Sequence, residues 1–254
     1  MSDCGISYAL VDGIARIALN RAPVNALNLD MIRAIVAALR RAAAEDEARA
    51  VVLASAIPRR YCAGLDLALL LGKFGGQARE LLQALYVDLH EAQYSLGKPS
   101  IAAVGGAARG GGMTLAISCD VIVAGESATF GYPEINIGVL PAIHFAHLPR
   151  IVGRHHAFEL LFSGRSFDAR EARELGLVSK IVADGKVDAA AAVLAADFAG
   201  KSPTAIRLGR AAFMRQNDYR RNVADAVEDF CNAAAMDAAQ EGIRAFLEKR
   251  APNW

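Results

Sequence analysis

The sequence has few cysteines, and neither sign of charge dominates. Four cysteines are scattered over 254 residues, at positions 4, 62, 119 and 231, and none forms a CxxC pair. Zinc ribbons and disulfide frameworks need clustered cysteines, so we expect free thiols in a reducing compartment. Lys and Arg number 28 and Asp and Glu number 27. With no general positive field, the chain is not expected to bind nucleic acid.

Long hydrophobic runs and several well-known motifs are also missing. No stretch of about 18 apolar residues is present, so no membrane span is expected. Residues 1–19 lack a basic cluster followed by an apolar run, which predicts a cytoplasmic protein without a signal peptide. The sequence contains no GxxxxGK[ST], HExxH, GxSxG or GxGxxG pattern. This excludes a P-loop, a zincin, a nucleophile elbow and a Rossmann fingerprint, and it predicts no metal site.

Apolar residues alternate between strand-like and helix-like spacing over the first two-thirds of the chain. This alternation favours an α/β fold with a mostly parallel sheet. Asn28 stands where a helix N-cap is expected, and 55–64 is expected to be a loop. The expected strands are 6–11, 14–19, 50–53, 100–104, 121–124, 128–130 and 178–182, and the expected early helices are 29–41, 77–95 and 113–118. The chain is expected to be mostly helical after Pro141.

Two glycine-containing segments follow expected buried strands. Residues 110–112 are all glycine and lead directly into a helix, while residues 62–66 contain small residues after the earlier strand. Bare backbone lets a ligand approach main-chain N–H groups closely. Two such turns facing one another supply two N–H donors to one oxygen, which defines an oxyanion hole. Tight strand-to-helix turns without chemistry explain the same glycines equally well.

Five separated motifs resemble the crotonase, or enoyl-CoA hydratase/isomerase, superfamily. They occur in the order typical of that family, and the similarity extends from Ile14 to the C-terminus. The motifs are YCAGLDL at 61–67, GGAARGGGMTLA at 105–116, CD at 119–120, FGYPEI at 130–135 and GLV at 176–178, with further similarity at 164–172 and 241–250.

The resemblance implies a fold and a substrate class. It implies a crotonase-like spiral core of ββα turns in residues 1–190 and a C-terminal helical region in residues 191–254. That region is expected to build homotrimers or dimers of trimers and to contact coenzyme A. The implied substrate is an acyl-CoA thioester, so coenzyme A arrives as part of the substrate and no separate cofactor is expected.

The resemblance also assigns the catalytic groups. The backbone N–H groups of Leu65 and Gly111 correspond to the family's oxyanion donors, and Glu134 corresponds to one of two catalytic carboxylates. Thr114 occupies the position of the other carboxylate. A single Glu is sufficient to move one proton between two carbons, so double-bond isomerisation is favoured. The alternatives are an enoyl-CoA hydratase, in which the Thr114 hydroxyl orients water, and a non-catalytic acyl-CoA-binding protein. Without the resemblance, Glu134 is a solvated loop acid or an ion-pair partner.

Further residues are assigned to substrate or CoA binding by the same resemblance. The sequence departs from the family pattern at 141–147, where Ile143, His144 and Phe145 are expected to border the acyl pocket and either to narrow it or to supply another acid or base. The alternative for His144 is a hydrogen-bonded structural residue. A second departure is Ala68, where relatives often carry Lys. Lys249 is either a phosphate ligand or a cation that favours a helix C-terminus. The assigned positions are Val24, Ala26, Ala63, Asp66, Leu67, Gly110, Pro133, His144, Phe230, Phe246 and Lys249.

Overall fold

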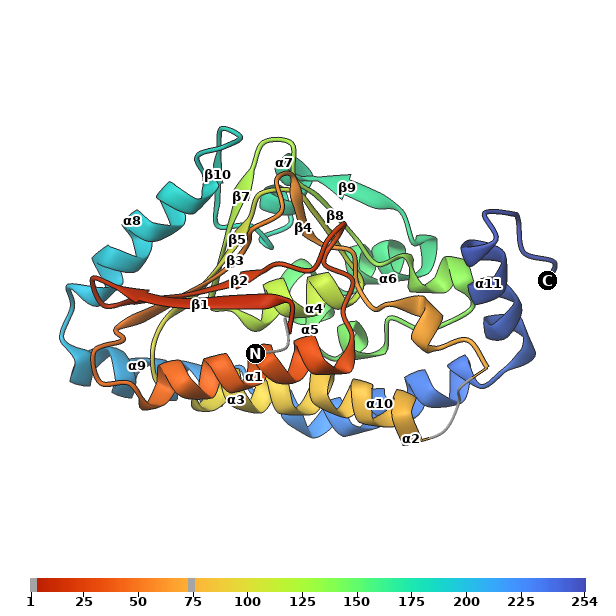
Figure 1. Ribbon diagram of the computed structural model, residues 1–254, viewed down its shortest axis with the longest axis horizontal. Helices are drawn as coiled ribbons and strands as arrows, with labels where there is room; N and C mark the ends of the chain where they lie inside the picture. The colour runs from red at the N-terminus through yellow and green to blue at the C-terminus, as the bar shows by residue number, and fades with distance from the viewer. Residues whose placement is uncertain (1–3, 73–75) are drawn as a thin grey trace.

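The computed structural model describes residues 4–72 and 76–254 and has two β-sheets surrounded by helices (Figure 1). The larger sheet has six strands in the order β1-β2-β3-β5-β7-β10. The first pair is antiparallel, and every later pair is parallel. Its strands are β1 (Ile6–Val11), β2 (Ile14–Leu19), β3 (Ala50–Ser55), β5 (Ser100–Val104), β7 (Val121–Gly125) and β10 (Lys180–Val182).

The smaller sheet has four strands in the order β4-β6-β8-β9. Its strands are β4 (Arg60–Cys62), β6 (Ala107–Arg109), β8 (Thr129–Gly131) and β9 (Ser166–Asp168). Three times in succession the chain places one strand in the larger sheet and the next strand in the smaller one, as β3-β4, β5-β6 and β7-β8. This repetition winds the chain into a spiral of ββα turns, which confirms the predicted fold class.

The central strands are buried on both faces. Val51 and Leu53 of β3 belong to the main core, whereas Ala50 and Val52 pack with α8 (Val187–Ala199) in a second cluster. Figure 1 shows α8 on one side of the larger sheet, with α1 (Leu29–Ala44), α3 (Leu89–Ser95) and α10 (Val223–Ala234) on the other. This arrangement explains the continuously apolar sequence of β3, because a strand covered on both faces has no polar side.

Local signals place the first helix as expected. Asn28 caps α1, and its side-chain oxygen accepts a hydrogen bond from the Met31 N–H at 2.9 Å. Ile32, Ile35 and Leu39 of α1 are buried, as their helical spacing predicts. The helical segment before α3 is less regular, since α2 (Gly76–Leu82) is followed by a π-helical segment, η2 (Gln83–Asp88).

The remaining elements are short helices around the smaller sheet and a helical C-terminal third. They are η1 (Leu67–Leu69), α4 (Gly111–Ser118), η3 (Pro133–Ile137), α5 (Ala142–Val152), α6 (Arg154–Ser163), α7 (Ala169–Glu174), α9 (Pro203–Gln216), η4 (Arg220–Asn222) and α11 (Asp237–Leu247). The proposed boundary at residue 190 falls inside α8, which packs on the larger sheet. The division into 1–190 and 191–254 stays a prediction.

Three expectations about local structure were wrong. The expected loop 55–64 contains β4, and the mostly helical stretch after Pro141 contains β9. Both strands have three residues, too few to produce a recognisable alternation. The single helix expected at 77–95 is interrupted by the π-helical segment.

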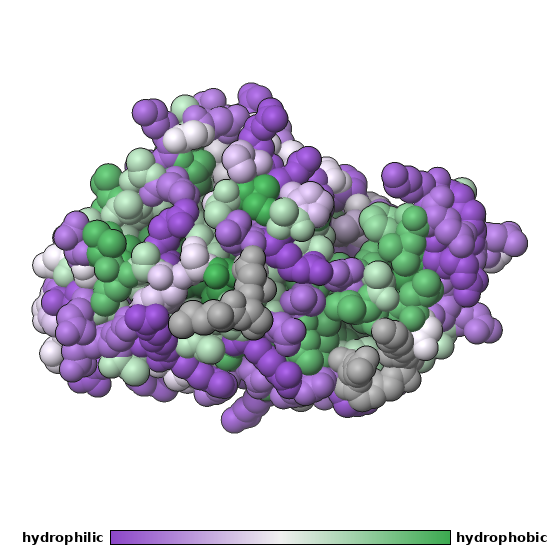
Figure 2. Space-filling model, viewed as in Figure 1, coloured by the Kyte–Doolittle hydropathy of each residue, from purple (hydrophilic) through white to green (hydrophobic). Residues whose placement is uncertain are grey.

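The C-terminal helices leave apolar side chains exposed. Phe230 and Ile243 are buried, but Leu208, Phe213, Phe246 and Leu247 are exposed. Figure 2 shows hydrophobic residues gathered on the visible face near α11. The predicted trimer or hexamer stays a prediction. No helix in residues 4–72 and 76–254 is long and apolar enough to cross a membrane.

Candidate active site

A pocket lies where the start of α4 meets η2, η3, α10 and α11. Its wall is mostly apolar, and Glu134 and Tyr86 are the two lining residues with polar side-chain atoms among those that the structure describes. The lining residues are Ala63, Gly64, Leu65, Leu67, Leu85, Tyr86, Gly110, Gly111, Pro133, Glu134, Ile137, Val139, Phe230 and Phe246.

Two main-chain segments meet at one side of this pocket. The Gly64 segment and the Gly111 segment are so close that a Cβ atom on Gly64 would lie 3.4 Å from the Gly111 nitrogen and 2.9 Å from the Arg109 carbonyl oxygen. Gly64 has a φ of +96° and Gly110 a φ of +48°, in the region that favours glycine. The two glycine-containing turns therefore face each other, as the oxyanion-hole interpretation of the sequence required.

A backbone bridge between Leu27 and Leu65 sets the direction of the Leu65 N–H group. The Leu27 N–H donates to the Gly64 carbonyl at 2.7 Å, and the Asp66 N–H donates to the Leu27 carbonyl at 2.9 Å. In such a parallel bridge the N–H of the middle residue points away from the partner strand. Neither the Leu65 nor the Gly111 N–H donates to any residue in the described ranges.

Gly111 is the first residue of α4, so its N–H belongs to the positive end of a helix. Together these two N–H groups form a pair of free donors on adjoining segments of one pocket wall. This arrangement is suited to stabilise negative charge on a carbonyl oxygen.

Glu134 projects into the same pocket from η3. A Cβ atom on Gly110 would lie 2.9 Å from Glu134 Oε1, so the carboxylate rests against the bare backbone that precedes α4. Its Oε2 atom is buried and accepts no hydrogen bond from the described residues. Burial raises the pKa of Glu134 from 4.5 to about 7. A carboxylate with this proton affinity is able to remove and return a proton near neutral pH.

This pKa predicts the pH dependence of activity. A base must be ionised, so kcat/KM of a reaction that uses Glu134 as its base is expected to rise with pH through an apparent pKa of about 7 and then to level off. The raised pKa also means that the Glu134 contribution to stability falls as pH rises from 4.5 to about 7. A pH series of initial rates measures the first effect. A rise in kcat/KM centred on the ordinary pKa of a solvated carboxylate would contradict the buried position of Glu134.

Thr114 lies behind this wall rather than on it. It is 1% exposed and does not line the pocket, and its Oγ1 atom is 3.4 Å from His144 Nε2. His144 Nδ1 is in turn 2.8 Å from His147 Nε2. Burial lowers the pKa of His144 to about 3, so its imidazole is neutral near pH 7. Thr114 therefore belongs to a buried polar cluster with His144 and His147.

None of residues 141–147 is among the described residues that line this pocket, so the expectation that they narrow it was wrong. Helix α5 begins at Ala142 and turns Ile143 and His144 into the core, both 0% exposed. Phe145 stacks on Phe162 of α6 instead. The predicted substrate contact by His144 is not part of this pocket.

Most of the other predicted residues lie on or beside the pocket. Residues 21–27 pack along 61–66, and the Ala63 N–H donates to the Val24 carbonyl at 3.1 Å. Arg21 connects two further predicted positions, since it donates to the Ala26 carbonyl at 2.6 Å and to the Asp66 carboxylate at 3.0 Å. Ala63, Leu67, Gly110, Pro133, Phe230 and Phe246 line the pocket, whereas Val24, Ala26, Asp66 and Lys249 do not.

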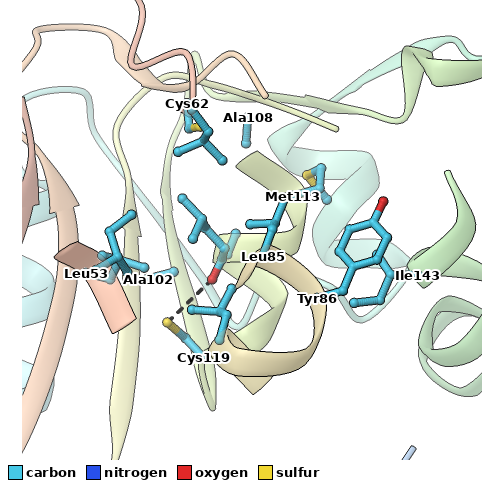
Figure 3. Close-up of a cluster of buried hydrophobic side chains, with 14 of the residues drawn as sticks. Leu53, Cys62, Leu85, Tyr86, Ala102, Ala108, Met113, Cys119 and Ile143 are labelled. Carbon is cyan, nitrogen blue, oxygen red and sulfur yellow. Dashed lines mark hydrogen bonds between the residues drawn. The ribbon is translucent and has the colours of Figure 1, made fainter. Parts of the chain in front are cut away.

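Four lining residues were missed by the sequence analysis: Leu85, Tyr86, Ile137 and Val139. Leu85 was assigned to a helical stripe and Tyr86 was not considered. Both belong to the main core cluster, part of which is drawn in Figure 3. The apolar spacing of residues 77–95 gives no indication of the π-helical turn at Gln83–Asp88. Within the described ranges, no group of three or more His, Cys, Asp or Glu side chains is arranged to hold a metal ion.

Paired main-chain donors beside one buried carboxylate are suited to proton transfer next to a carbonyl group. Comparison with known proteins agrees. The profile of the family described as enoyl-CoA hydratase/isomerase matches residues 10–254. The chain is 36% identical over 241 residues to the 2,3-dehydroadipyl-CoA hydratase of Escherichia coli, covering 93% of this chain and 92% of that protein.

Other relatives give the same result. The chain is 34% identical over 253 residues to a probable enoyl-CoA hydratase of Bacillus subtilis, with 98% of each chain covered. A crystal structure of an enoyl-CoA hydratase/isomerase from Pseudoalteromonas atlantica superposes with a TM-score of 0.86 at 28% identity, covering 98% of this chain and 99% of that one. The chain belongs to the enoyl-CoA hydratase/isomerase family and is an acyl-CoA-processing enzyme of that family.

Proposed function

We propose that the protein moves a carbon–carbon double bond in an enoyl-CoA thioester, with Glu134 as the single acid and base. The carboxylate removes a proton from C2 of a 3-enoyl-CoA, and the electrons of that C–H bond form an enolate. The Leu65 and Gly111 N–H groups stabilise the enolate oxygen. Glu134 then returns the proton to C4, which gives the 2-enoyl-CoA without any other reactant.

One observation carries this proposal: a single carboxylate enters the described pocket, and it is buried with a pKa of about 7. The Thr114 position supplies no group to this pocket, because its side chain lies behind the wall next to His144. A reaction that needs one proton carrier fits this arrangement best. Coenzyme A is then part of the substrate, and we propose no separate cofactor.

Hydration of a 2-enoyl-CoA is the second candidate. The relatives named above include a 2,3-dehydroadipyl-CoA hydratase, and the pocket holds one further polar side chain, Tyr86. A non-catalytic acyl-CoA-binding protein is the third candidate, and the buried carboxylate in the pocket favours the two catalytic ones, because burying an acid there serves proton transfer but not binding of a thioester.

Product analysis tests the proposed function. The purified protein is incubated separately with a 3-enoyl-CoA and a 2-enoyl-CoA, each in short, medium and long acyl versions, and products are identified by chromatography and mass spectrometry. Conversion of 3-enoyl to 2-enoyl-CoA is the expected result. Binding of the thioesters without any conversion would contradict the proposal and favour the non-catalytic alternative.

A further inference from the structure

Tyr86 is the second polar side chain in a pocket that is otherwise apolar. It is 3% exposed and lines the pocket together with Glu134. Its hydroxyl forms no hydrogen bond with any part of the chain that the structure describes. Tyr61 and Tyr132 also carry hydroxyls without partners, but neither of them lines this pocket.

The backbone around Tyr86 departs from a regular helix. Residues Gln83–Asp88 are π-helical, and the Leu89 N–H donates to the Ala84 carbonyl five residues earlier. Such wide turns are rare and occur often at functional sites. Here the two consecutive residues Leu85 and Tyr86 both line the pocket.

His90 stabilises this segment from behind. Its Nδ1 atom is 2.7 Å from the Tyr86 carbonyl oxygen. Because a carbonyl oxygen only accepts hydrogen bonds, Nδ1 carries a proton. Burial lowers the pKa of His90 to about 4, so the imidazole is neutral near pH 7. The aromatic ring of Tyr86 packs edge-on against Phe230 of α10, with centroids 6.4 Å apart. These contacts hold the phenol in a fixed position on the pocket wall.

The Tyr86 and Glu134 side chains line the same pocket. Burial and the nearby Glu134 carboxylate raise the pKa of Tyr86 well above its usual value. The phenol therefore keeps its proton throughout the working pH range and remains a neutral donor and acceptor. Glu134 Oε2 and the Tyr86 hydroxyl are two unpaired polar atoms in one apolar pocket.

We propose that Tyr86 takes the place of the missing second carboxylate by holding a water molecule against Glu134, so that the pocket also hydrates 2-enoyl-CoA. This inference rests on the proposed function of the same site. The water donates one hydrogen to Glu134 Oε2 and the other to the Tyr86 oxygen, which leaves a lone pair directed at C3 of the substrate.

The step balances without any further reactant. The water oxygen bonds to C3 as Glu134 takes one of its protons, and the C2–C3 π electrons move to the thioester oxygen as an enolate. Leu65 and Gly111 stabilise that oxygen. Glu134 then donates the proton to C2, which gives the 3-hydroxyacyl-CoA. Isomerisation involves no water, so it does not need Tyr86.

Tyr86→Phe separates the two reactions. The variant is expected to lose about 10- to 100-fold in kcat/KM for hydration of a 2-enoyl-CoA, because the reacting water is no longer oriented. Isomerisation of a 3-enoyl-CoA is expected to fall much less than hydration, because Glu134, the proton carrier of that reaction, is still present. Tyr61→Phe is the matched control, since it removes an unpartnered buried hydroxyl outside the pocket.

Each outcome supports or overturns the proposal. A selective loss of hydration in Tyr86→Phe supports it. Full hydration by that variant, an equal loss of both reactions, or no hydration by the unaltered protein at any acyl length overturns it. Glu134→Gln distinguishes failure of the proposed function, because both reactions would survive in that variant if Glu134 were not the base.

Discussion

Glu134→Gln is expected to lower kcat for enoyl-CoA conversion by about 10²- to 10⁴-fold, the usual contribution of a positioned acid or base. The amide has nearly the same shape as the carboxylate but cannot take a proton from carbon. KM is expected to change little, because the role proposed for the carboxylate is at the reacting carbons and not at the nucleotide. Steady-state kinetics on the substrate identified by product analysis measures both constants.

Thermal unfolding measurements distinguish a loss of catalysis in this variant from a loss of folded protein. Burial disfavours the ionised carboxylate, so the Gln variant is expected to unfold at the same temperature as the unaltered protein or at a higher one above pH 7. Glu126→Gln, in the exposed turn between β7 and β8, is the matched control and is expected to retain full activity. A Glu134→Gln enzyme that is folded and fully active would rule out Glu134 as the base.

Gly64→Ala is expected to have the second largest effect, about 10²- to 10³-fold in kcat, similar to the loss of one oxyanion donor. The added Cβ atom would lie 2.9 Å from the Arg109 carbonyl oxygen and 3.4 Å from the Gly111 nitrogen. The two backbone segments must separate to accept it. This movement displaces the Leu65 and Gly111 N–H groups from each other without removing any side chain of the pocket.

Gly185→Ala controls for backbone strain in this experiment. Gly185 has a φ of +78°, comparable with the +96° of Gly64, but an added Cβ atom there meets nothing within 4 Å. Both variants pay the cost of a left-handed alanine, so both are expected to lose some stability. Only Gly64→Ala is expected to lose activity. Equal kcat values for the two variants would show that the Gly64–Gly111 contact is not needed for catalysis.

The sequence was most informative where backbone geometry is encoded by residue type. Small residues at 62–66 and the glycines at 110–112 predicted two turns that face each other, because only residues without bulky side chains permit this approach. Continuous apolar runs correctly predicted strands covered on both faces, such as β3. These features depend on local sequence and were predictable.

Side-chain direction was much less predictable. The motif placed Thr114 at the position of a catalytic carboxylate, but motif position does not determine whether a short side chain reaches the substrate. The structure places its hydroxyl next to His144, which comes from a helix 30 residues further along the chain. Contacts between residues so far apart in sequence depend on packing rather than on spacing.

Tyr86 shows a second reason for missing a site residue. The stripe of Leu81, Leu85 and Leu89 indicated a regular helix with one buried face. A π-helical turn shifts the residues that follow it relative to that face, and the apolar pattern of the segment contains no sign of this shift. Helix periodicity therefore predicted the buried face of this segment, but not that Leu85 and Tyr86 form part of the pocket wall.

The most direct test of the central claim, that Glu134 moves a proton beside the thioester carbonyl, is deuterium uptake. A 3-enoyl-CoA is incubated in D₂O with the unaltered enzyme or with Glu134→Gln, and the thioester is analysed by mass spectrometry over time. We predict conversion to the 2-enoyl-CoA, with deuterium at C4 only in those turnovers in which the proton on Glu134 exchanges with solvent before it is returned. In the variant, neither conversion nor uptake is expected on the same timescale. Conversion and deuterium uptake at the same rate in Glu134→Gln would contradict the account.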